Sequence, residues 1–236
     1  MKYWTFCFLF VLASLSAAEF HFKDRLEKGS KGDYFVFEAN KTATLIAIRS
    51  ISPTKILLEE ISVPSSKIPS SWSQWTQSKA PGHTSWSMIE IDLVNGVPLD
   101  CYSFSRSAWI QISQKESLLA TLLHLSLHPI ESDRRRRIGP SPLPGEMDLR
   151  KFWNPPMVVE GRKKESAAFD VFETDWPEDG TELSGKTVSL YFDREKKFPF
   201  PFWIQIETAH GTGALRAIDC GKNLPASHRS IPRNFN

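Results

Sequence analysis

Short runs of alternating apolar and polar residues dominate the chain, and this pattern predicts β-strands. Residues 33–38, 43–51 and 55–63 are rich in β-branched and aromatic side chains. Turn-forming residues at 40–41 and 52–53 separate them. We therefore expect a meander of three short strands near the start of the folded region.

The strongest strand signal covers residues 85–93, where Ile89 and Ile91 alternate with acidic residues. An Asn-Gly pair at 95–96 favours a tight turn into a second strand over residues 97–104. These two segments predict a β-hairpin. Three further strands are expected in the last third of the chain, over residues 186–192, 202–208 and 213–219.

Two segments have helical features. Over residues 68–79, two tryptophans share a helical face, although the serine-rich composition suits a loop equally well. Over residues 114–127, a capping box formed by Ser113 and Glu116 favours a helix. Leucines in the same segment also alternate as in a strand, so both structures stay open. We favour a helix for its first half.

A segment rich in arginine and proline, residues 133–146, interrupts the strand pattern. Its proline density excludes a regular ladder and predicts a stiff extended loop. The loop could separate two domains, but neither side has enough predicted helix to cover its own sheet. We therefore favour one domain over residues 19–236. Its predicted fold is mainly β (α+β), a single strongly curved, half-barrel-like antiparallel sheet with one or two helices.

The first 18 residues have the features of a secretory signal peptide. Lys2 precedes an apolar run, residues 6–15, and Ser16, Ala17 and Ala18 supply the small residues that signal peptidase requires. A retained membrane anchor is the alternative, but the run is shorter than the roughly 20 residues that a spanning helix needs. We expect cleavage near Ala18 and an exported protein, periplasmic or secreted.

Composition and charge narrow the class of protein. Of the 236 residues, 41% are hydrophobic and 24% charged, which indicates a packed core and not a disordered chain. A net charge of +2 gives no field strong enough to indicate nucleic acid as a partner. After cleavage two cysteines remain, Cys101 and Cys220, which suit one disulfide in an oxidising compartment. Two buried free thiols are the alternative.

Catalytic motifs are absent from the sequence, which lacks Gly-x-Ser-x-Gly, a phosphate-binding loop and paired cysteines. We therefore predict neither an enzyme nor a cofactor. His124 and His128 would share a face on a helix, but no Glu lies between them as in metalloproteases. Acidic residues between 173 and 182 do not have EF-hand spacing. Both groups are interpreted as surface residues, and no metal site is predicted.

The strongest local charge is the run Arg134, Arg135, Arg136 and Arg137. Four guanidinium groups on a proline-stiffened loop could bind phosphate bidentately. We predict that they dock an anion, on an acidic partner or by peripheral contact with an anionic membrane surface. A solvated charge run is the alternative.

Aromatic residues are abundant, and many lie beside prolines, so they form either core or an apolar concave surface. In the strand predicted over residues 202–208, Trp203 and Gln205 share one amphipathic face. We expect Trp86, Met88, Trp203 and Gln205 to line a site for a hydrophobic ligand. The alternative is that such residues belong to the core.

The final strands resemble a known family. Residues 191–193, 200–206 and 215–219, in a chain with many strands and few helices, resemble the bacterial half-barrel lipoprotein carriers of the LolA and LolB kind, over roughly residues 185–220. The resemblance implies a curved antiparallel sheet, closed by helices, that holds acyl chains in its concavity. Residues 145–150 followed by 153–156 also resemble a bacterial envelope family without assigned activity.

These features together predict a binding protein of the bacterial envelope. Its expected partner is a lipid, a lipidated protein or another hydrophobic ligand, with the arginine run assisting at an anionic head group. The alternative is a structural or protein-interaction module, which binds another envelope protein through sheet edges and loops and has no small ligand. A hydrolase with a dispersed active site is a third hypothesis.

Overall fold

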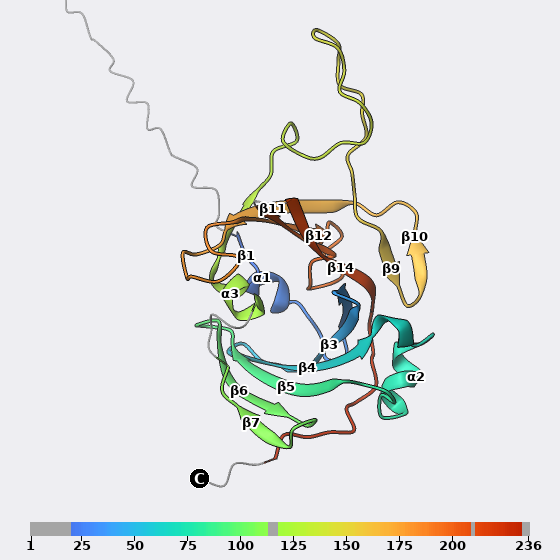
Figure 1. Cartoon of the computed structure of the whole chain (residues 1–236), viewed down its shortest axis with the longest axis vertical. Coiled ribbons are helices and arrows are strands. Elements are labelled where there is room, and N and C mark those ends of the chain that lie inside the picture. Colours follow the sequence, from blue (N-terminus) through green and yellow to red (C-terminus); the bar gives the residue numbers. More distant parts are fainter. Residues whose placement is uncertain (1–19, 113–117, 209–210, 233–236) are drawn as a thin grey trace, which may run out of the picture.

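Figure 1 shows the computed structural model, which describes residues 20–112, 118–208 and 211–232. The predicted signal peptide, residues 1–18, and the predicted capping box of Ser113 and Glu116 lie outside the described residues. Antiparallel strands make up most of the regular secondary structure in the described residues, so the mainly β class is confirmed. None of the described helices is long and apolar enough to cross a lipid bilayer.

Short strands and a few short helices alternate along the described residues. The strands are β1 (Phe20–His21), β2 (Tyr34–Ala39), β3 (Thr42–Ile51), β4 (Lys55–Pro64), β5 (Ser85–Asp92), β6 (Val97–Ser103), β7 (Ala108–Ile110), β8 (Ser126–Pro129), β9 (Met157–Val159), β10 (Arg162–Lys164), β11 (Phe169–Asp175), β12 (Thr187–Asp193), β13 (Trp203–Thr208) and β14 (Gly211–Gly221). The helices are α1 (Lys23–Leu26), α2 (Trp72–Gln77) and α3 (Leu118–His124), and a 3₁₀ turn covers Ser65–Lys67.

A 12-stranded antiparallel sheet is the main element, in the order β1-β8-β11-β12-β13-β14-β2-β3-β4-β5-β6-β7. The separate pair β9–β10 forms a small hairpin. Strands from both sides of the arginine- and proline-rich segment pair within the large sheet, since β14 joins β2 and β11 joins β8. The segment is therefore a connection between strands, and Figure 1 shows it extending away from them.

Each face of the sheet carries its own hydrophobic core, because strands such as β2 bury alternate residues on both faces. On one face, here the α1/α3 face, Phe22 and Leu26 of the α1 region and Leu122 of α3 pack against Phe35 and other strand residues. Figure 1 shows α1 and α3 between the strands at the two ends of the sheet order. On the opposite face, the α2 face, Trp72 and Trp75 of α2 pack against the strands.

Most of the expected strands are confirmed. The three strands of the first meander, the hairpin around the Asn-Gly pair and the three strands of the last third correspond to β2–β6 and β12–β14. Residues 68–79 contain helix α2, which begins after Ser71, whose hydroxyl accepts a hydrogen bond from the Gln74 amide at 3.3 Å. Residues 118–124 are helical and 126–129 form a strand, so each of the two patterns in that segment describes one part of it.

The predicted disulfide is absent from the structure, where Cys101 and Cys220 are free, buried thiols. Cys101 lies on β6 and Cys220 on β14, and four strands separate β6 from β14 in the sheet. The thiol of Cys220 instead donates a hydrogen bond to the carbonyl oxygen of Val158 at 3.2 Å. Cysteine number and compartment contain no information on this separation, which is why the expectation was wrong.

Candidate ligand-binding cavity

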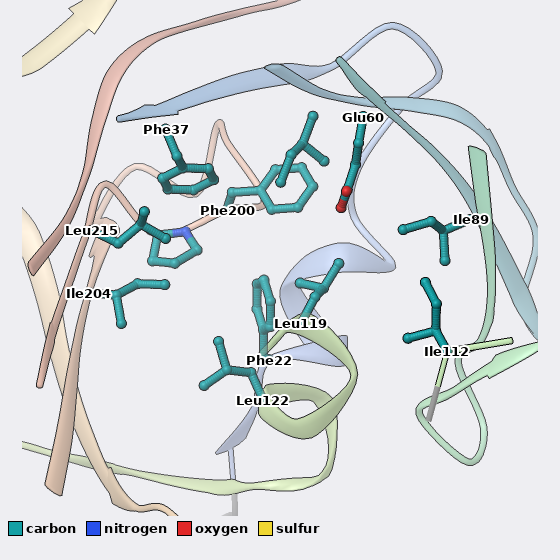
Figure 2. Close-up of a pocket in the computed structure, with 12 residues that line it drawn as sticks. Phe22, Phe37, Glu60, Ile89, Ile112, Leu119, Leu122, Phe200, Ile204 and Leu215 are labelled. Carbon is teal, nitrogen blue, oxygen red and sulfur yellow. The ribbon is translucent and has the colours of Figure 1, made fainter. Parts of the chain in front are cut away.

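A cavity of about 280 Å³ lies on the α1/α3 face of the sheet. Strands, helix α3, the residue before α1 and the loop before β13 all contribute to its wall (Figure 2). The lining residues are Phe22, Phe37, Ile46, Glu60, Ile89, Ile112, Leu119, Leu122, Phe200, Pro201, Ile204 and Leu215. All of these described residues except Glu60 are apolar, so the cavity favours the hydrophobic part of a ligand.

Strand register brings these side chains together from distant parts of the sequence. Ile204 of β13 lies directly opposite Leu215 of β14, and Ile46 of β3 lies directly opposite Glu60 of β4. Directly opposed residues in antiparallel strands project from the same face of a sheet. The cavity therefore joins the strands that precede residue 100 with those that follow residue 200.

Helix α3 contributes the residues that lie across the cavity from the sheet. Leu119 and Leu122 are three positions apart, so they share one side of the helix, and both line the cavity. Phe22, the residue before α1, also points into this space in Figure 2. Its ring packs on those of Phe192 and Phe200, with centroids 5.7 and 6.3 Å away. The wall opposite the strands is thus supported by a cluster of aromatic rings.

Among the described lining residues, Glu60 alone can ionise, and its carboxylate points into the cavity (Figure 2). Burial among apolar groups raises the pKa of Glu60, and neither a hydrogen bond nor a charge from the described residues opposes that effect. Burial also raises the pKa of the nearby Cys101 thiol to about 11, with the negative charge of Glu60 as the second cause. The cavity therefore combines an apolar wall with one acid that lacks a partner among the described residues.

Two of the predicted ligand residues, Trp86 and Met88, do not line this cavity. Both are buried on β5, and Trp86 belongs to the core of the α2 face. Its indole nitrogen donates a hydrogen bond to a carboxylate oxygen of Glu59 at 2.7 Å. The neighbouring residue Ile89 lines the cavity instead. Alternation correctly separates the two faces of β5, but both faces are buried, so it does not reveal which one borders a cavity.

Trp203 and Gln205 also lie outside the cavity lining, although Ile204 between them belongs to it. Trp203 packs edge-on against Trp153, with ring centroids 5.2 Å apart, and Trp153 packs in the same way on Tyr191 at 5.4 Å. The amphipathic side of β13 thus supports the segment that contains Trp153. That these two residues line a ligand site stays a prediction, and such a site would be distinct from this cavity.

The four arginines lie near the start of the connection between β8 and β9, residues 130–156, which we call the arm. Arg134 donates hydrogen bonds to both carboxylate oxygens of Glu173, at 2.6 and 2.8 Å. The guanidinium carbons of Arg135 and Arg137 each lie 4.6 Å from the ring centroid of Phe152. The same distance separates Arg136 from Trp153. The arginines therefore make contacts within the protein, and these contacts connect Arg136 to Trp203 through Trp153.

The two histidines and the acidic residues between 173 and 182, which were predicted to be surface residues, do not form a common site in the described structure. His124 ends α3 whereas His128 lies in β8, so they do not share a helical face. In the acidic segment, Glu173 pairs with Arg134, and Asp179 accepts a hydrogen bond from the indole nitrogen of Trp176 at 3.1 Å. Within the described residues, no group of three His, Cys, Asp or Glu side chains is close enough to hold a metal ion.

Neither Glu60 nor any other residue of the cavity is among the site residues that the sequence predicts. A signal was present, because Glu59 and Glu60 are consecutive in a predicted strand, and consecutive strand residues project from opposite faces. One carboxylate on each face of a strand is informative when both faces are apolar. Which of the two has partners depends on contacts that are distant in the sequence.

The fold and the cavity define a mainly β protein that carries a largely apolar cavity on one face of a large antiparallel sheet. The chain belongs to the CT021 family, because the family model matches residues 44–165, just over half of its length. It is similar in structure to the hypothetical protein CT021 from Chlamydia trachomatis, with 20% sequence identity and a TM-score of 0.62. The match covers 92% of this chain and 99% of that protein, and at this identity it establishes the fold alone. A search of curated proteins found no match.

Proposed function

We propose that this protein is an exported binding protein of the bacterial cell envelope, which holds the apolar part of a lipid, a lipidated protein or another hydrophobic partner in the cavity. The observation that carries the proposal is the lining, in which eleven of the twelve described residues are apolar. A volume of about 280 Å³ is near the lower end of the roughly 300–1,000 Å³ typical of small-molecule sites. It suits one acyl chain or one compact apolar group.

The proposed fold is a half-barrel of the kind found in the LolA and LolB carriers. Its support is the 12-stranded antiparallel sheet, together with the placement of α1 and α3 between the strands at its two ends (Figure 1). The proposed export rests on the apolar run and the small residues within positions 1–18. We propose that residues 19–236 are the mature protein, one β-rich domain that acts without a cofactor and is not an enzyme.

The test is uptake of a fluorescent fatty acyl probe by the protein purified after export and extracted with organic solvent. We expect saturable binding with one site per chain. Leu215→Trp places a large ring in the cavity wall and should abolish this binding. Ala214→Trp, at the neighbouring exposed position that projects from the opposite face of β14, is the matched control and should bind as the parent protein does.

Native mass spectrometry before and after extraction supplies an independent readout. An extractable adduct on the parent protein, absent from Leu215→Trp and present on Ala214→Trp, would support the proposed function. Absence of saturable probe uptake by the extracted parent protein would overturn it. Equal uptake by both tryptophan variants would show that the probe binds elsewhere.

A protein-interaction module is the second candidate function, and the arm carries the observation that favours it. Ile138, Leu143, Met147 and Leu149 are exposed there, the last two at 80% and 83%. Apolar side chains this exposed on a projecting segment are typical of a surface that contacts another protein. The expected partner is another envelope protein, recovered at a fixed stoichiometry in a pull-down with the parent chain. Its loss on replacing these four residues by serine, with probe uptake intact, would favour this candidate.

A further inference from the structure

Glu60 is an acid in surroundings that do not stabilise its charge. It lies opposite Ile46 in the sheet, and Ile89 and Leu119 line the same cavity. The described residues supply no cation and no hydrogen-bond donor to its carboxylate. Its neighbour Glu59, by contrast, is fully buried and accepts bonds from Arg49, Trp86 and Ser227. The lack of partners therefore distinguishes the acid that points into the cavity.

A charge in an apolar cavity is unfavourable unless an opposite charge or several donors accompany it. Glu60 can avoid this penalty in two ways. It can bind a proton, or a ligand can supply the missing cation. A ligand with a carboxylate or phosphate inside the cavity would instead bring two anions together, which raises the free energy of the complex. The cavity thus disfavours anionic groups near Glu60 and favours cationic ones.

We propose that the cavity selects hydrophobic amines, with the alkyl or aryl part of the ligand against the apolar wall and its ammonium group paired with the carboxylate of Glu60. This inference rests on the proposed function, that the cavity holds a hydrophobic ligand, and adds the chemical class. Hydrogen bonds between ionised partners are roughly twice as strong as those between neutral ones. An amine therefore gains more from Glu60 than an alcohol of the same length does.

The described groups around Glu60 are uncharged, so Glu60 alone among them can pair with an ammonium group. Cys101 of β6 is the titratable side chain whose pKa the charge of Glu60 affects, and it stays a neutral thiol at ordinary pH because its pKa is about 11. The cavity residues contributed by β2, β3, β5, α3, β13 and β14 are all apolar. No described residue of the lining therefore competes with Glu60 for the ammonium group.

Proton balance gives the proposal a second readout. Burial raises the pKa of Glu60, which favours its protonated form when the cavity is empty. Pairing with an ammonium ion requires the carboxylate, so the carboxyl proton must leave to the buffer as the amine binds. Affinity for the amine is then expected to rise with pH until the amine itself loses its proton.

The experiment is calorimetric titration of the exported, extracted protein with octylamine, octanol and octanoate at pH 7, each below its micelle concentration. We expect octylamine to bind about tenfold more tightly than octanol, and octanoate to bind most weakly. Buffers with different ionisation enthalpies report the proton released. Glu60→Gln should remove both the preference and the proton release while octanol binding persists. Glu90→Gln, which removes an acid paired with Lys55 on the opposite face of the sheet, is the charge-matched control.

The results of this titration distinguish selection by Glu60 from the binding of hydrophobic ligands in the cavity. Equal binding of all three ligands would overturn the selection by Glu60 and leave the binding function intact. Absence of binding by all three ligands would overturn both. Glu60→Leu gives a further check if Glu60→Gln folds poorly, because an apolar side chain suits the cavity. A preference for octylamine that survives in a folded Glu60 variant would also overturn the inference.

Discussion

Glu59 and Glu60 are adjacent in β4, yet their carboxylates lie on opposite faces of the sheet and in opposite electrostatic surroundings. Glu59 forms an ion pair with Arg49, and the side chains of both residues are almost completely buried. Arg49 also donates a hydrogen bond to the carbonyl oxygen of Pro225 at 2.6 Å, and Ser227 bonds to Glu59. Glu59 therefore binds the C-terminal segment to the α2 face, whereas Glu60 is available to a ligand.

This contrast predicts different effects on stability for the same substitution at adjacent positions. Glu59→Gln leaves the buried Arg49 without its counter-ion, so we expect the free energy of unfolding to fall by about 3–5 kcal/mol. Glu60→Gln removes an unpaired acid, so the free energy should stay unchanged or rise by about 1 kcal/mol. Urea unfolding at neutral pH measures both values. Similar losses for the two variants would contradict the assignment of separate roles.

The pH dependence of stability should identify Glu60 independently. Its pKa in the folded protein is raised above that of the unfolded chain, so the folded protein binds more protons between the two values. The stabilising contribution is complete below the unfolded pKa, about 4.3, and is lost as the pH rises through the folded pKa. The parent protein should thus lose stability relative to Glu60→Gln as the pH rises from about 4.3.

The informative quantity is the difference in unfolding free energy between the parent protein and Glu60→Gln. Burial also raises the pKa values of Asp33 and Asp219, and their contributions have the same sign. Both groups are present in the parent and in the variant, so they cancel when the unfolding free energies are subtracted. Parallel pH profiles for the two proteins would show that the folded state does not perturb Glu60.

Local sequence patterns were sufficient for most of the strands but not for the site. The acidic alternation around Ile89 and the Asn-Gly turn involve neighbouring residues, so they predicted β5 and β6 correctly. Very short strands such as β1 and β10 were missed, because two or three residues are too few for a periodic pattern. Their pairing partners determine that they are strands.

The predicted ligand residues lie outside the cavity lining for a related physical reason. Trp86 and Ile89 both belong to a correctly predicted strand, and the sequence separates their faces. The cavity, however, is lined by Ile89 together with Ile204 and Leu119, which are distant in the chain. Glu59 likewise accepts a hydrogen bond from Ser227, which is 168 residues away in the sequence. Contacts of this range depend on sheet order, and alternation within one strand contains no information about that order.

Gly96 is predicted to be essential to the close approach of the β5–β6 turn to α3. Its φ is +61°, and a Cβ atom there would lie 2.8 Å from Nε2 of His124 and 3.1 Å from Cβ of Leu123. Gly96→Ala should therefore lower the free energy of unfolding by about 1–2 kcal/mol. Gly161→Ala is the matched control, because its φ is +74° but nothing lies within 4 Å of the added atom. Thermal or urea unfolding measures both variants, and equal losses of unfolding free energy would show that the contact with α3 does not contribute to the effect of Gly96→Ala.

The two buried cysteines should react only when the protein unfolds. Burial raises the pKa of Cys101 to about 11 and raises that of Cys220 further, so neither forms much thiolate near neutral pH. Folded protein should react slowly with an aromatic disulfide reagent at pH 8, and urea should expose both thiols. Intact mass before and after reduction checks the same point, because a disulfide would make the unreduced chain lighter by two hydrogen atoms. Such a difference would contradict the free thiols of the structure.

Anion docking by the arm is predicted to depend on Arg135 and Arg136 more than on Arg134, which is already paired with Glu173. The guanidinium carbons of Arg135 and Arg136 lie over aromatic rings at 4.6 Å from the centroids, and neither arginine has a carboxylate partner in the described residues that would compete with phosphate oxygens. We therefore expect salt-sensitive flotation with phosphatidylglycerol vesicles and little with phosphatidylcholine vesicles. The double variant Arg135→Ala, Arg136→Ala should lose most of this binding. Replacing Lys163 and Lys164 of β10 by alanine removes the same charge from another part of the surface, and an equal loss in that variant would contradict docking by the arm.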